Sequence, residues 1–306
     1  MSHHDFEGVP FRGYLELDIA AEYLADLITR GELSLLLGAG VSMSSGLPSW
    51  KALVEGCEAD AGLDIPKKER SSQELMEAID SVRRKLHRDG RDGEMFAVVR
   101  RNLYPEQYLG ASTYPDEILE QRMLIAIGAM VMSSSRGSVS DVFTLNFDDL
   151  LEWYLHLHGF TTQVVSNFPM TLRGDRDVAI FHPHGFLPLV EEPFSRSDWL
   201  VLSHSELVDR LTGDGSKWPL LLESRFLSKR ILAIGTSMND IDLQVLFRKT
   251  RKEIGDRPLG FVLVATMETD KQEALLEAGL VPLVVGSHEA IPEFLMRVCR
   301  LAAAKV

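Results

Sequence analysis

Cysteine, long apolar runs and positive charge are all scarce in this chain of 306 residues. The two cysteines, Cys57 and Cys299, lie far apart and outside any C-x-x-C pattern, which favours reduced thiols and a cytoplasmic setting. No apolar run approaches the roughly 20 residues that span a bilayer, and the N-terminus lacks a signal-peptide pattern, so we expect no membrane association. The net charge of −13 argues against direct binding of nucleic acid, which requires a basic face.

The remaining composition is that of an ordinary soluble globular protein, with 45% hydrophobic and 25% charged residues. Short apolar runs alternate with helical patterns, which predicts an α/β fold with a mostly parallel sheet and helices on both faces. These runs are residues 33–37, 142–143, 164–165, 178–181, 231–234, 261–265 and 283–285. Residues 53–133 show helical patterns without a convincing strand. We therefore expect a single domain over residues 1–306 with an inserted helical subdomain at 53–133.

A glycine turn follows the first apolar run directly, at Gly38-Ala39-Gly40, and a helical pattern begins at Lys51. This strand, glycine loop and helix suit a dinucleotide pyrophosphate, because glycines admit the phosphates and free N–H groups with a helix N-terminus supply positive charge. The next glycine, Gly46, follows Gly40 by six residues instead of three, so G-x-G-x-x-G is not met. The loop therefore indicates dinucleotide binding of a different kind.

Three further motifs each follow a candidate strand, where ligands bind in parallel sheets. They are Thr144-Leu145-Asn146-Phe147-Asp148, Phe181-His182-Pro183-His184-Gly185 and Gly235-Thr236-Ser237-Met238-Asn239-Asp240-Ile241-Asp242-Leu243. With the glycine turn and the segment 46–50, their order resembles the SIR2 (sirtuin) superfamily over residues 33–246. Within it, the chain is similar to the SIR2-like NAD-consuming proteins of bacterial anti-phage defence.

The resemblance implies a Rossmann-like sheet and NAD+ as the substrate. Sirtuins that deacylate proteins carry a zinc ribbon of four cysteines, and two lone cysteines cannot supply it, so the helical subdomain would replace that ribbon. The implied activity is NAD+ glycohydrolysis to nicotinamide and ADP-ribose, which would deplete NAD+ in an infected bacterial cell. The alternatives are a non-catalytic module that binds NAD+ or ADP-ribose and, disfavoured by the missing cysteines, a protein deacylase. The sequence leaves open whether NADP+ is accepted.

Two residues are the candidates for catalysis. Asn146 would orient the ribose and a water molecule, because an amide donates and accepts hydrogen bonds without adding charge. His184 would be the general base, since a neutral imidazole takes a proton near pH 7. For His182 we expect a buried, hydrogen-bonded side chain. A metal site on His182 and His184 lacks a third ligand, so we expect no bound zinc.

The resemblance also assigns residues to NAD+ binding: Gly38, Ala39, Gly40, Ser42, Gly46, Pro48, Trp50, Thr144, Asp148, Gly235, Thr236, Ser237 and Asp240. Several keep a second interpretation. Trp50 would either cover the nicotinamide ribose or anchor its helix. Asp148 would cap the following helix and also brace the site loop. Asp242 would bind ribose or stabilise a helix start, and Glu206 fits a capping pattern.

An enzyme that destroys NAD+ must be gated. In its length, the chain resembles those SIR2-like defence proteins that act with a second protein, such as a HerA-like ATPase or a short Argonaute. We therefore expect control by such a partner or by homo-oligomerisation through the terminal helices, one near residue 14 and one after His288. The alternative is that these helices cover the faces of the sheet.

Overall fold

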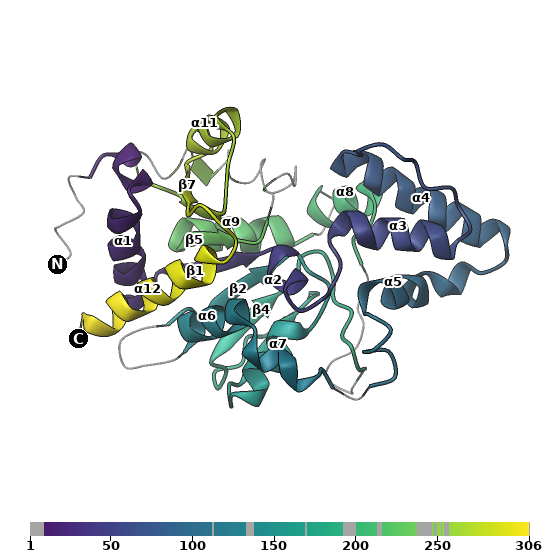
Figure 1. Ribbon diagram of the computed structural model, residues 1–306, viewed down its shortest axis with the longest axis horizontal. Helices are drawn as coiled ribbons and strands as arrows, with labels where there is room; N and C mark the ends of the chain where they lie inside the picture. Colours follow the sequence, from purple (N-terminus) through teal and green to yellow (C-terminus); the bar gives the residue numbers. More distant parts are fainter. Residues whose placement is uncertain are drawn as a thin grey trace.

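A seven-stranded sheet with every neighbouring pair of strands parallel forms the centre of the molecule, as the computed structural model shows (Figure 1). The structure describes residues 9–111, 113–132, 138–168, 170–191, 200–212, 216–236, 238, 247, 250–251, 253 and 257–305. The strands are β1 (Leu33–Leu37), β2 (Asp141–Thr144), β3 (Thr162–Val165), β4 (Val178–Phe181), β5 (Arg230–Ile234), β6 (Gly260–Val264) and β7 (Leu280–Val284). The predicted Rossmann-like α/β class is confirmed.

The strand order, β3-β4-β2-β1-β5-β6-β7, places the first strand at the centre. Leu35 on β1 pairs with Val142 on β2 at one side and with Leu232 on β5 at the other. The chain builds outward from β1 to β2 first and returns later to β5, so the strand order reverses between β1 and β5. In open parallel sheets, the crevice beyond the carboxyl ends at this reversal is where ligands bind.

Alternate residues of the strands other than β3 contribute to two hydrophobic clusters on opposite faces of the sheet. On β1, Leu35 and Leu37 join one cluster, while Leu36 joins the other. The described helices are α1 (Leu17–Thr29), α2 (Gly40–Met43), α3 (Trp50–Asp60), α4 (Ser72–Arg88), α5 (Met95–Leu103), α6 (Arg122–Val131), α7 (Leu150–Leu157), α8 (His204–Thr212), α9 (Trp218–Ser228), α11 (Thr269–Glu277) and α12 (Ala290–Ala304). Helices α1, α6, α7 and α12 cover the first cluster, and α9 and α11 cover the second.

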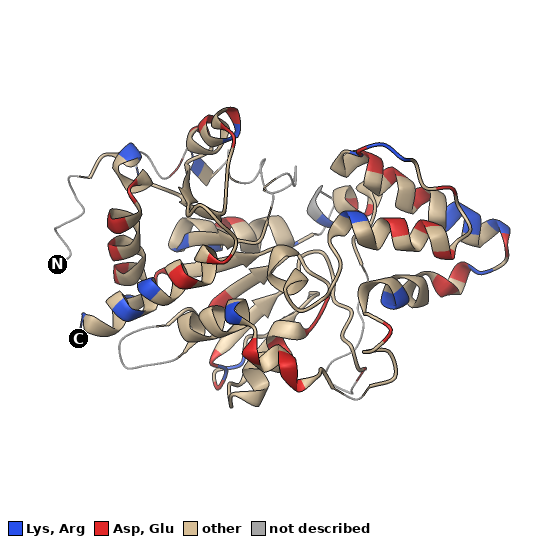
Figure 2. Cartoon of the chain, viewed as in Figure 1, with Lys and Arg blue, Asp and Glu red and all other residues tan. Residues whose placement is uncertain are grey.

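Between β1 and β2, the described chain is helical, as predicted for this stretch. Helices α3, α4 and α5 project to one side of the sheet and α8 packs against α4 (Figure 1). A capping box at Ser71 and Glu74 begins α4, and Ser49 caps α3 by accepting the Ala52 N–H. Helix α6 also lies in the range 53–133, yet it packs against α12 and α7 on the sheet. Charged residues concentrate on the outer helices and the strands are almost free of them (Figure 2).

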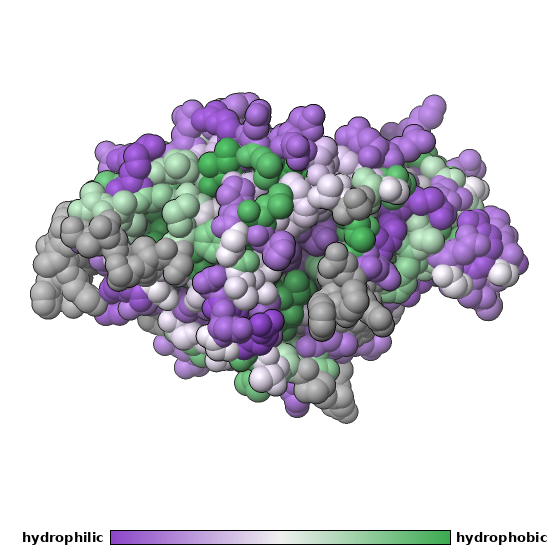
Figure 3. Space-filling view, turned by 90° about the horizontal axis from the view of Figure 1, so that it is seen from below, coloured by the Kyte–Doolittle hydropathy of each residue, from purple (hydrophilic) through white to green (hydrophobic). Residues whose placement is uncertain are grey.

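The apolar side of the C-terminal helix, α12, packs against the rest of the chain. Ile291, Phe294, Leu295 and Val298 of α12 are buried in the core cluster, where α12 packs against α1 and α6. The alternative role of the terminal helices, to cover the sheet, is therefore the one observed, and this stripe is not exposed for oligomerisation. On the face seen in Figure 3, hydrophobic residues form separate patches between hydrophilic ones. Among the described helices, none has the length and apolarity to cross a bilayer.

Candidate functional site

Two glycine turns meet at the carboxyl ends of β1 and β5. The Gly40 N–H donates to the Gly235 carbonyl at 2.8 Å, and the Gly38 N–H donates to the Ile234 carbonyl at 3.0 Å. A Cβ on Gly38 would lie 2.7 Å from the Gly235 oxygen, and one on Gly40 would lie 2.8 Å from the Gly235 Cα. Gly235 itself has φ +68°, and its Cβ would lie 2.7 Å from the Val41 nitrogen. Only glycines permit this approach of the two backbones.

The contact between the turns changes one step of the sequence argument. We expected free N–H groups at the first turn and a helical pattern from Lys51. Helix α3 does begin at Trp50, but a further short helix, α2, begins directly at Gly40. The N–H groups of Gly38 and Gly40 donate to β5 and its turn, and that of Ser42 donates to the Ala39 carbonyl. Close packing of the turns therefore explains these glycines without a ligand, and their contact with a pyrophosphate stays a prediction.

Asn146 lies against the first glycine turn, although it follows a different strand. Its Nδ2 donates to the Gly38 carbonyl at 3.2 Å and to the Ser42 hydroxyl at 3.0 Å. Its main-chain N–H donates to the Thr144 hydroxyl at 3.2 Å. The amide group of this half-buried residue is thereby fixed in orientation by its two N–H bonds. No described residue donates a hydrogen bond to its side-chain oxygen, Oδ1, so this oxygen can face a ligand.

The Ser42 hydroxyl continues this chain of hydrogen bonds by donating to Oδ1 of Asp148 at 3.1 Å. The same oxygen accepts the Leu150 N–H at 3.3 Å, so Asp148 satisfies the first N–H of α7 and braces the site loop, although the N-cap position itself is Asp149. Burial, followed by the charges of Glu152 and Asp149, raises the pKa of the Asp148 carboxyl to about 7. Near neutral pH, this carboxyl therefore exchanges a proton beside Asn146.

His182 is fully buried and hydrogen-bonded, which confirms the expectation for this residue. Its Nδ1 lies 3.1 Å from the Asn146 carbonyl oxygen and its Nε2 lies 2.6 Å from Oε1 of Glu152. Burial acts to lower the pKa of His182, but the charge and hydrogen bond of Glu152 and the Asn146 carbonyl outweigh it, so the pKa is raised. The side chain of His182 thus joins the loop after β4 to the loop after β2.

His184 lies in the turn that follows β4. The Gly185 N–H closes this turn by donating to the His182 carbonyl at 3.1 Å, and the His184 carbonyl accepts the Val201 N–H at 2.7 Å. The His184 residue is half-buried, in contrast to His182. Because His182 holds the Asn146 loop, both catalytic candidates lie on connected loops at the same edge of the sheet.

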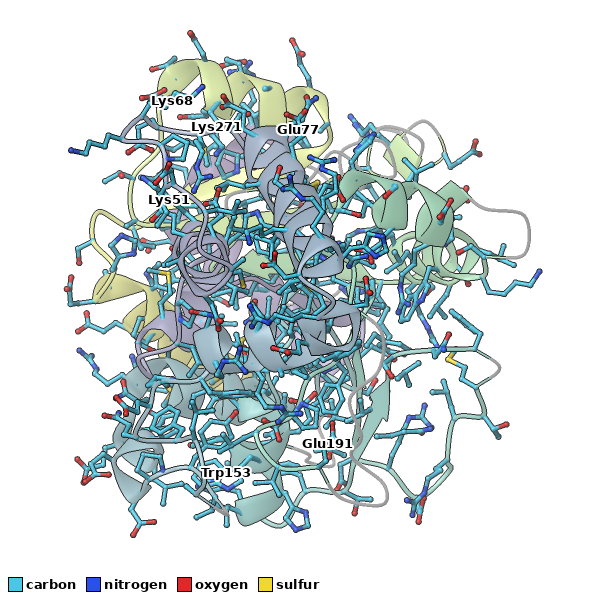
Figure 4. The ribbon with its side chains drawn as sticks, turned by 90° about the vertical axis from the view of Figure 1, so that its right-hand side faces the viewer. Lys51, Lys68, Glu77, Trp153, Glu191 and Lys271 are labelled. Atoms are coloured by element: carbon cyan, nitrogen blue, oxygen red, sulfur yellow. The ribbon has the colours of Figure 1, made fainter. Side chains whose placement is uncertain are left out.

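The segment before α3 places Trp50 beside the Asn146 loop, where its ring meets that of Phe147 edge-on at 6.4 Å between centroids. Trp50 also packs against the core cluster, so the anchoring role has support and covering a ribose stays a prediction. Gly46 has φ +84° and lies exposed in the loop, followed by half-buried Pro48. The Lys51 ammonium forms an ion pair with Glu69 at 2.9 Å. Figure 4 shows Lys51 on the same side of the molecule as Lys68.

A cavity of about 1260 Å³ opens beside the glycine turns at the ends of β5 and β6. Gly40, Gly235 and Thr236 form one wall, and the segment 262–268 forms another. Lys271, Arg122 and His288 bring basic groups to the cavity, and Glu120, Glu268 and Glu289 bring acidic ones. Asn146 and His184 are not among the described residues that line it. The cavity and Asn146 therefore lie on the two sides of the first glycine turn.

Some predicted residues lie outside the described part of the chain, namely Ser237, Asp240 and Asp242. The capping role predicted for Glu206 is confirmed, because its Oε2 accepts hydrogen bonds from the N–H groups of Leu202 and Ser203 at 2.9 and 3.0 Å. Over the described ranges, no cluster of three or more His, Cys, Asp and Glu side chains could hold a metal ion. Burial raises the pKa of the Cys57 thiol to about 12 and that of Cys299 to about 11, so neither is a reactive thiolate.

Comparison with known families matches residues 140–283 to the family described as SIR2-like domain. The matched part runs from the start of β2 into β7 and contains Asn146, His184, Gly235 and Thr236. It supports placing this part of the chain in the SIR2-like superfamily, whose members are typically NAD-utilising enzymes. No curated protein matches the chain.

Two carboxylates with structural roles were not predicted from the sequence, namely buried Glu152 on α7 and half-buried Asp149 at its start. Glu152 pairs with His182, and Asp149 accepts hydrogen bonds from the hydroxyls of Tyr114 at 2.7 Å and Tyr104 at 3.3 Å. A signal was present for Glu152, because it is a lone acidic residue in the otherwise apolar run 150–155. A charge in that position of a buried helix needs a partner.

The raised pKa values of Asp148 and His182 predict that the free energy of unfolding decreases as the pH rises through neutrality. Asp148 has a pKa raised from 3.8 to about 7, so the stability linked to its proton is present below about pH 4 and is lost as the pH rises through 7. His182, with its raised pKa, acts in the same direction above pH 6.5. We expect Asp148→Asn to flatten this decline and to melt about 5 °C above the wild type at pH 8. Thermal unfolding between pH 5 and pH 8.5 measures it, and equal slopes for both proteins would contradict it.

Proposed function

We propose that this chain is an NAD+ glycohydrolase that cleaves NAD+ to nicotinamide and ADP-ribose. In this reaction, the bond between C1′ and the nicotinamide nitrogen breaks, and a water oxygen bonds to C1′. Asn146 orients the ribose and this water, and His184 accepts the water proton. The observation that carries the proposal is that Asn146 is fixed by Gly38 and Ser42 against the glycine turn after β1, which borders the strand-order reversal of a sheet whose residues 140–283 match a SIR2-like domain.

The positions of the cavity and of Asn146 suggest how NAD+ would lie. The adenosine would enter the cavity beside Gly235 and Thr236, and the pyrophosphate would cross the first glycine turn. The nicotinamide ribose would then reach the amide of Asn146, whose oxygen is directed away from its two protein hydrogen bonds. The contacts expected of Ala39, Gly46, Pro48, Trp50, Ser237 and Asp240 belong to this same proposal.

A physiological role follows from the resemblance to phage-defence proteins. We propose that the enzyme acts in the cytoplasm of a bacterium and depletes NAD+ during infection. The first alternative is a module that binds NAD+ or ADP-ribose without cleaving it. It needs the glycine turns but has no use for the ordered Asn146 amide. A protein deacylase is the less favoured alternative, because the chain lacks the four zinc-ligating cysteines.

The decisive experiment mixes the purified protein with NAD+ and follows nicotinamide and ADP-ribose by chromatography. Equal amounts of both products support the proposal. Binding of NAD+ by calorimetry without product favours the regulatory module, and release of nicotinamide only with an acylated peptide favours the deacylase. A parallel reaction with NADP+ determines whether a 2′-phosphate is accepted.

Control of this activity is expected to come from assembly, because unchecked NAD+ loss would kill the host cell. We propose a second defence protein, such as a HerA-like ATPase or a short Argonaute, or a homo-oligomer that forms through surfaces other than the buried stripe of α12. The expected result is low turnover by the isolated chain and strong activation in the assembled state. Turnover and light scattering, measured over a range of protein concentrations, test this. A monomer that is fully active at nanomolar concentration contradicts it.

A further inference from the structure

His182 lies between the two loops that carry the catalytic candidates. Its main-chain N–H donates to the Val165 carbonyl at 2.8 Å, which fixes the loop after β4 to the neighbouring strand β3. Its imidazole reaches in the other direction, where Nδ1 is 3.1 Å from the Asn146 carbonyl oxygen. A carbonyl oxygen only accepts hydrogen bonds, so Nδ1 carries a proton and donates. The Asn146 carbonyl therefore determines that the ring nitrogen facing it, Nδ1, carries a proton.

Glu152 fixes the opposite edge of the same ring. Its Oε1 is 2.6 Å from Nε2, and both side chains are buried. The ring also meets Phe186 edge-on at 4.7 Å between centroids. With hydrogen bonds at both nitrogens and an aromatic ring beside it, the imidazole has one orientation.

Ionisable groups on several elements surround the His182 imidazole. Glu152 faces it from α7 and Asp148 approaches it from the start of that helix. Arg210 of α8 donates through Nη2 to the His182 carbonyl at 3.3 Å. The imidazole thus lies among carboxyl groups that favour its protonated form, and a charged donor makes a stronger hydrogen bond than a neutral one.

We propose that His182 and Glu152 are positioning residues that hold the Asn146 main chain in register with the loop of His184. The proposal rests on the function proposed above, in which Asn146 and His184 act on the same substrate. Asn146 is then held from two sides, with Gly38 and Ser42 fixing its amide and His182 fixing its carbonyl. A displacement of about 1 Å at a reacting group lowers turnover by about a hundredfold, so this second contact affects rate more than binding.

A buried ion pair can also serve folding alone, and two substitutions of His182 separate these roles. The amide nitrogen of asparagine occupies the place of Nδ1, so His182→Asn keeps the hydrogen bond to Asn146 and loses Glu152. Glutamine places its amide near Nε2, so His182→Gln keeps Glu152 and loses Asn146. Leaving Glu152 without its partner makes His182→Asn the less stable of the two variants.

We expect the order of turnover to be the reverse of the order of stability. His182→Gln should lose about a hundredfold in kcat with little change in KM, and His182→Asn should lose less than about tenfold despite its lower melting temperature. Lys229→Gln provides a matched control, because Lys229 forms a partly buried ion pair with Asp141 at the opposite end of β2. It should lower the melting temperature and leave kcat unchanged. Equal kcat values for the two His182 variants, or values that follow the melting temperatures, would overturn the proposal.

A spectroscopic measurement tests the positioning even if the wild type cleaves no NAD+, which would overturn only the proposed function. In protein labelled with ¹⁵N at asparagine, the main-chain and side-chain amide signals of Asn146 report its environment. We expect His182→Gln to move both Asn146 signals, while His182→Asn and Lys229→Gln leave them near their wild-type positions. Unmoved Asn146 signals in His182→Gln would show that the histidine does not position this residue, whatever the activity of the wild type.

Discussion

Asn146→Ala and His184→Ala should each lower NAD+ turnover by at least about a hundredfold while leaving the fold intact. The first substitution removes the amide that Gly38 and Ser42 orient at the strand-order reversal. The second removes the proposed base. The fold should survive because both residues are only half-buried, and the lost hydrogen bonds of Asn146 contribute about 1 kcal/mol each. Initial rates of nicotinamide release and melting temperatures measure the two effects.

Matched controls for these variants are available on exposed positions. Asn167 and His156 are both exposed, and Asn167→Ala and His156→Ala should keep wild-type rates. Near-wild-type turnover in both Asn146→Ala and His184→Ala would show that other residues carry out the chemistry. Loss of folding in either variant, seen by circular dichroism, would instead assign that residue a structural role.

Gly235→Ala should be among the most destabilising single substitutions in the chain, with a loss of about 3 kcal/mol or more in the free energy of unfolding. The added Cβ would lie 2.7 Å from the Val41 nitrogen, so the turns after β1 and β5 must separate. Their separation breaks the hydrogen bond from Gly40 to the Gly235 carbonyl and displaces Ser42, a partner of Asn146. Turnover should therefore fall together with stability.

Gly62→Ala isolates the backbone-strain part of this effect, so its difference from Gly235→Ala gives the steric part. Gly62 has φ +70°, close to the +68° of Gly235, but a Cβ there would meet nothing within 4 Å. Its cost should be limited to the backbone strain of about 1 to 2 kcal/mol, with unchanged turnover. Denaturant unfolding of both variants gives the comparison. Equal losses in the two would mean that the close approach of the turns contributes nothing beyond the strain.

The sequence predicts every strand of the sheet, because strands buried on both faces appear as short apolar runs. The predicted strand bounds differ most from the observed ones at the two edge strands, β3 and β7. For β3, the prediction covers 164–165 and omits Thr162 and Gln163, which are half-buried and polar. For β7, it begins at Leu283 and misses residues 280–282, because Pro282 argues against a strand. An edge strand tolerates proline, since its missing N–H can face away from the sheet.

The candidate site is only partly readable from the sequence. The motifs give the residues at the carboxyl ends of the strands, because topology brings these ends together. They do not give the hydrogen bonds among those residues. Glu152 and His182 are 30 positions apart, and nothing in either motif pairs them. Nor do the motifs show that the N–H groups of Gly38 and Gly40 donate to the carbonyls of Ile234 and Gly235.

The central place of β1 also determines when the crevice can exist during synthesis. Leu35 is synthesised well before its partner Leu232 on β5, because three other strands of the sheet lie between them in the sequence. Until then, the first glycine turn has neither Ile234 nor Gly235 to accept its N–H groups. The crevice beyond β1 and β5 is therefore completed only after β2, β3 and β4 have been synthesised, so a ligand that needs both glycine turns can bind only from that point on.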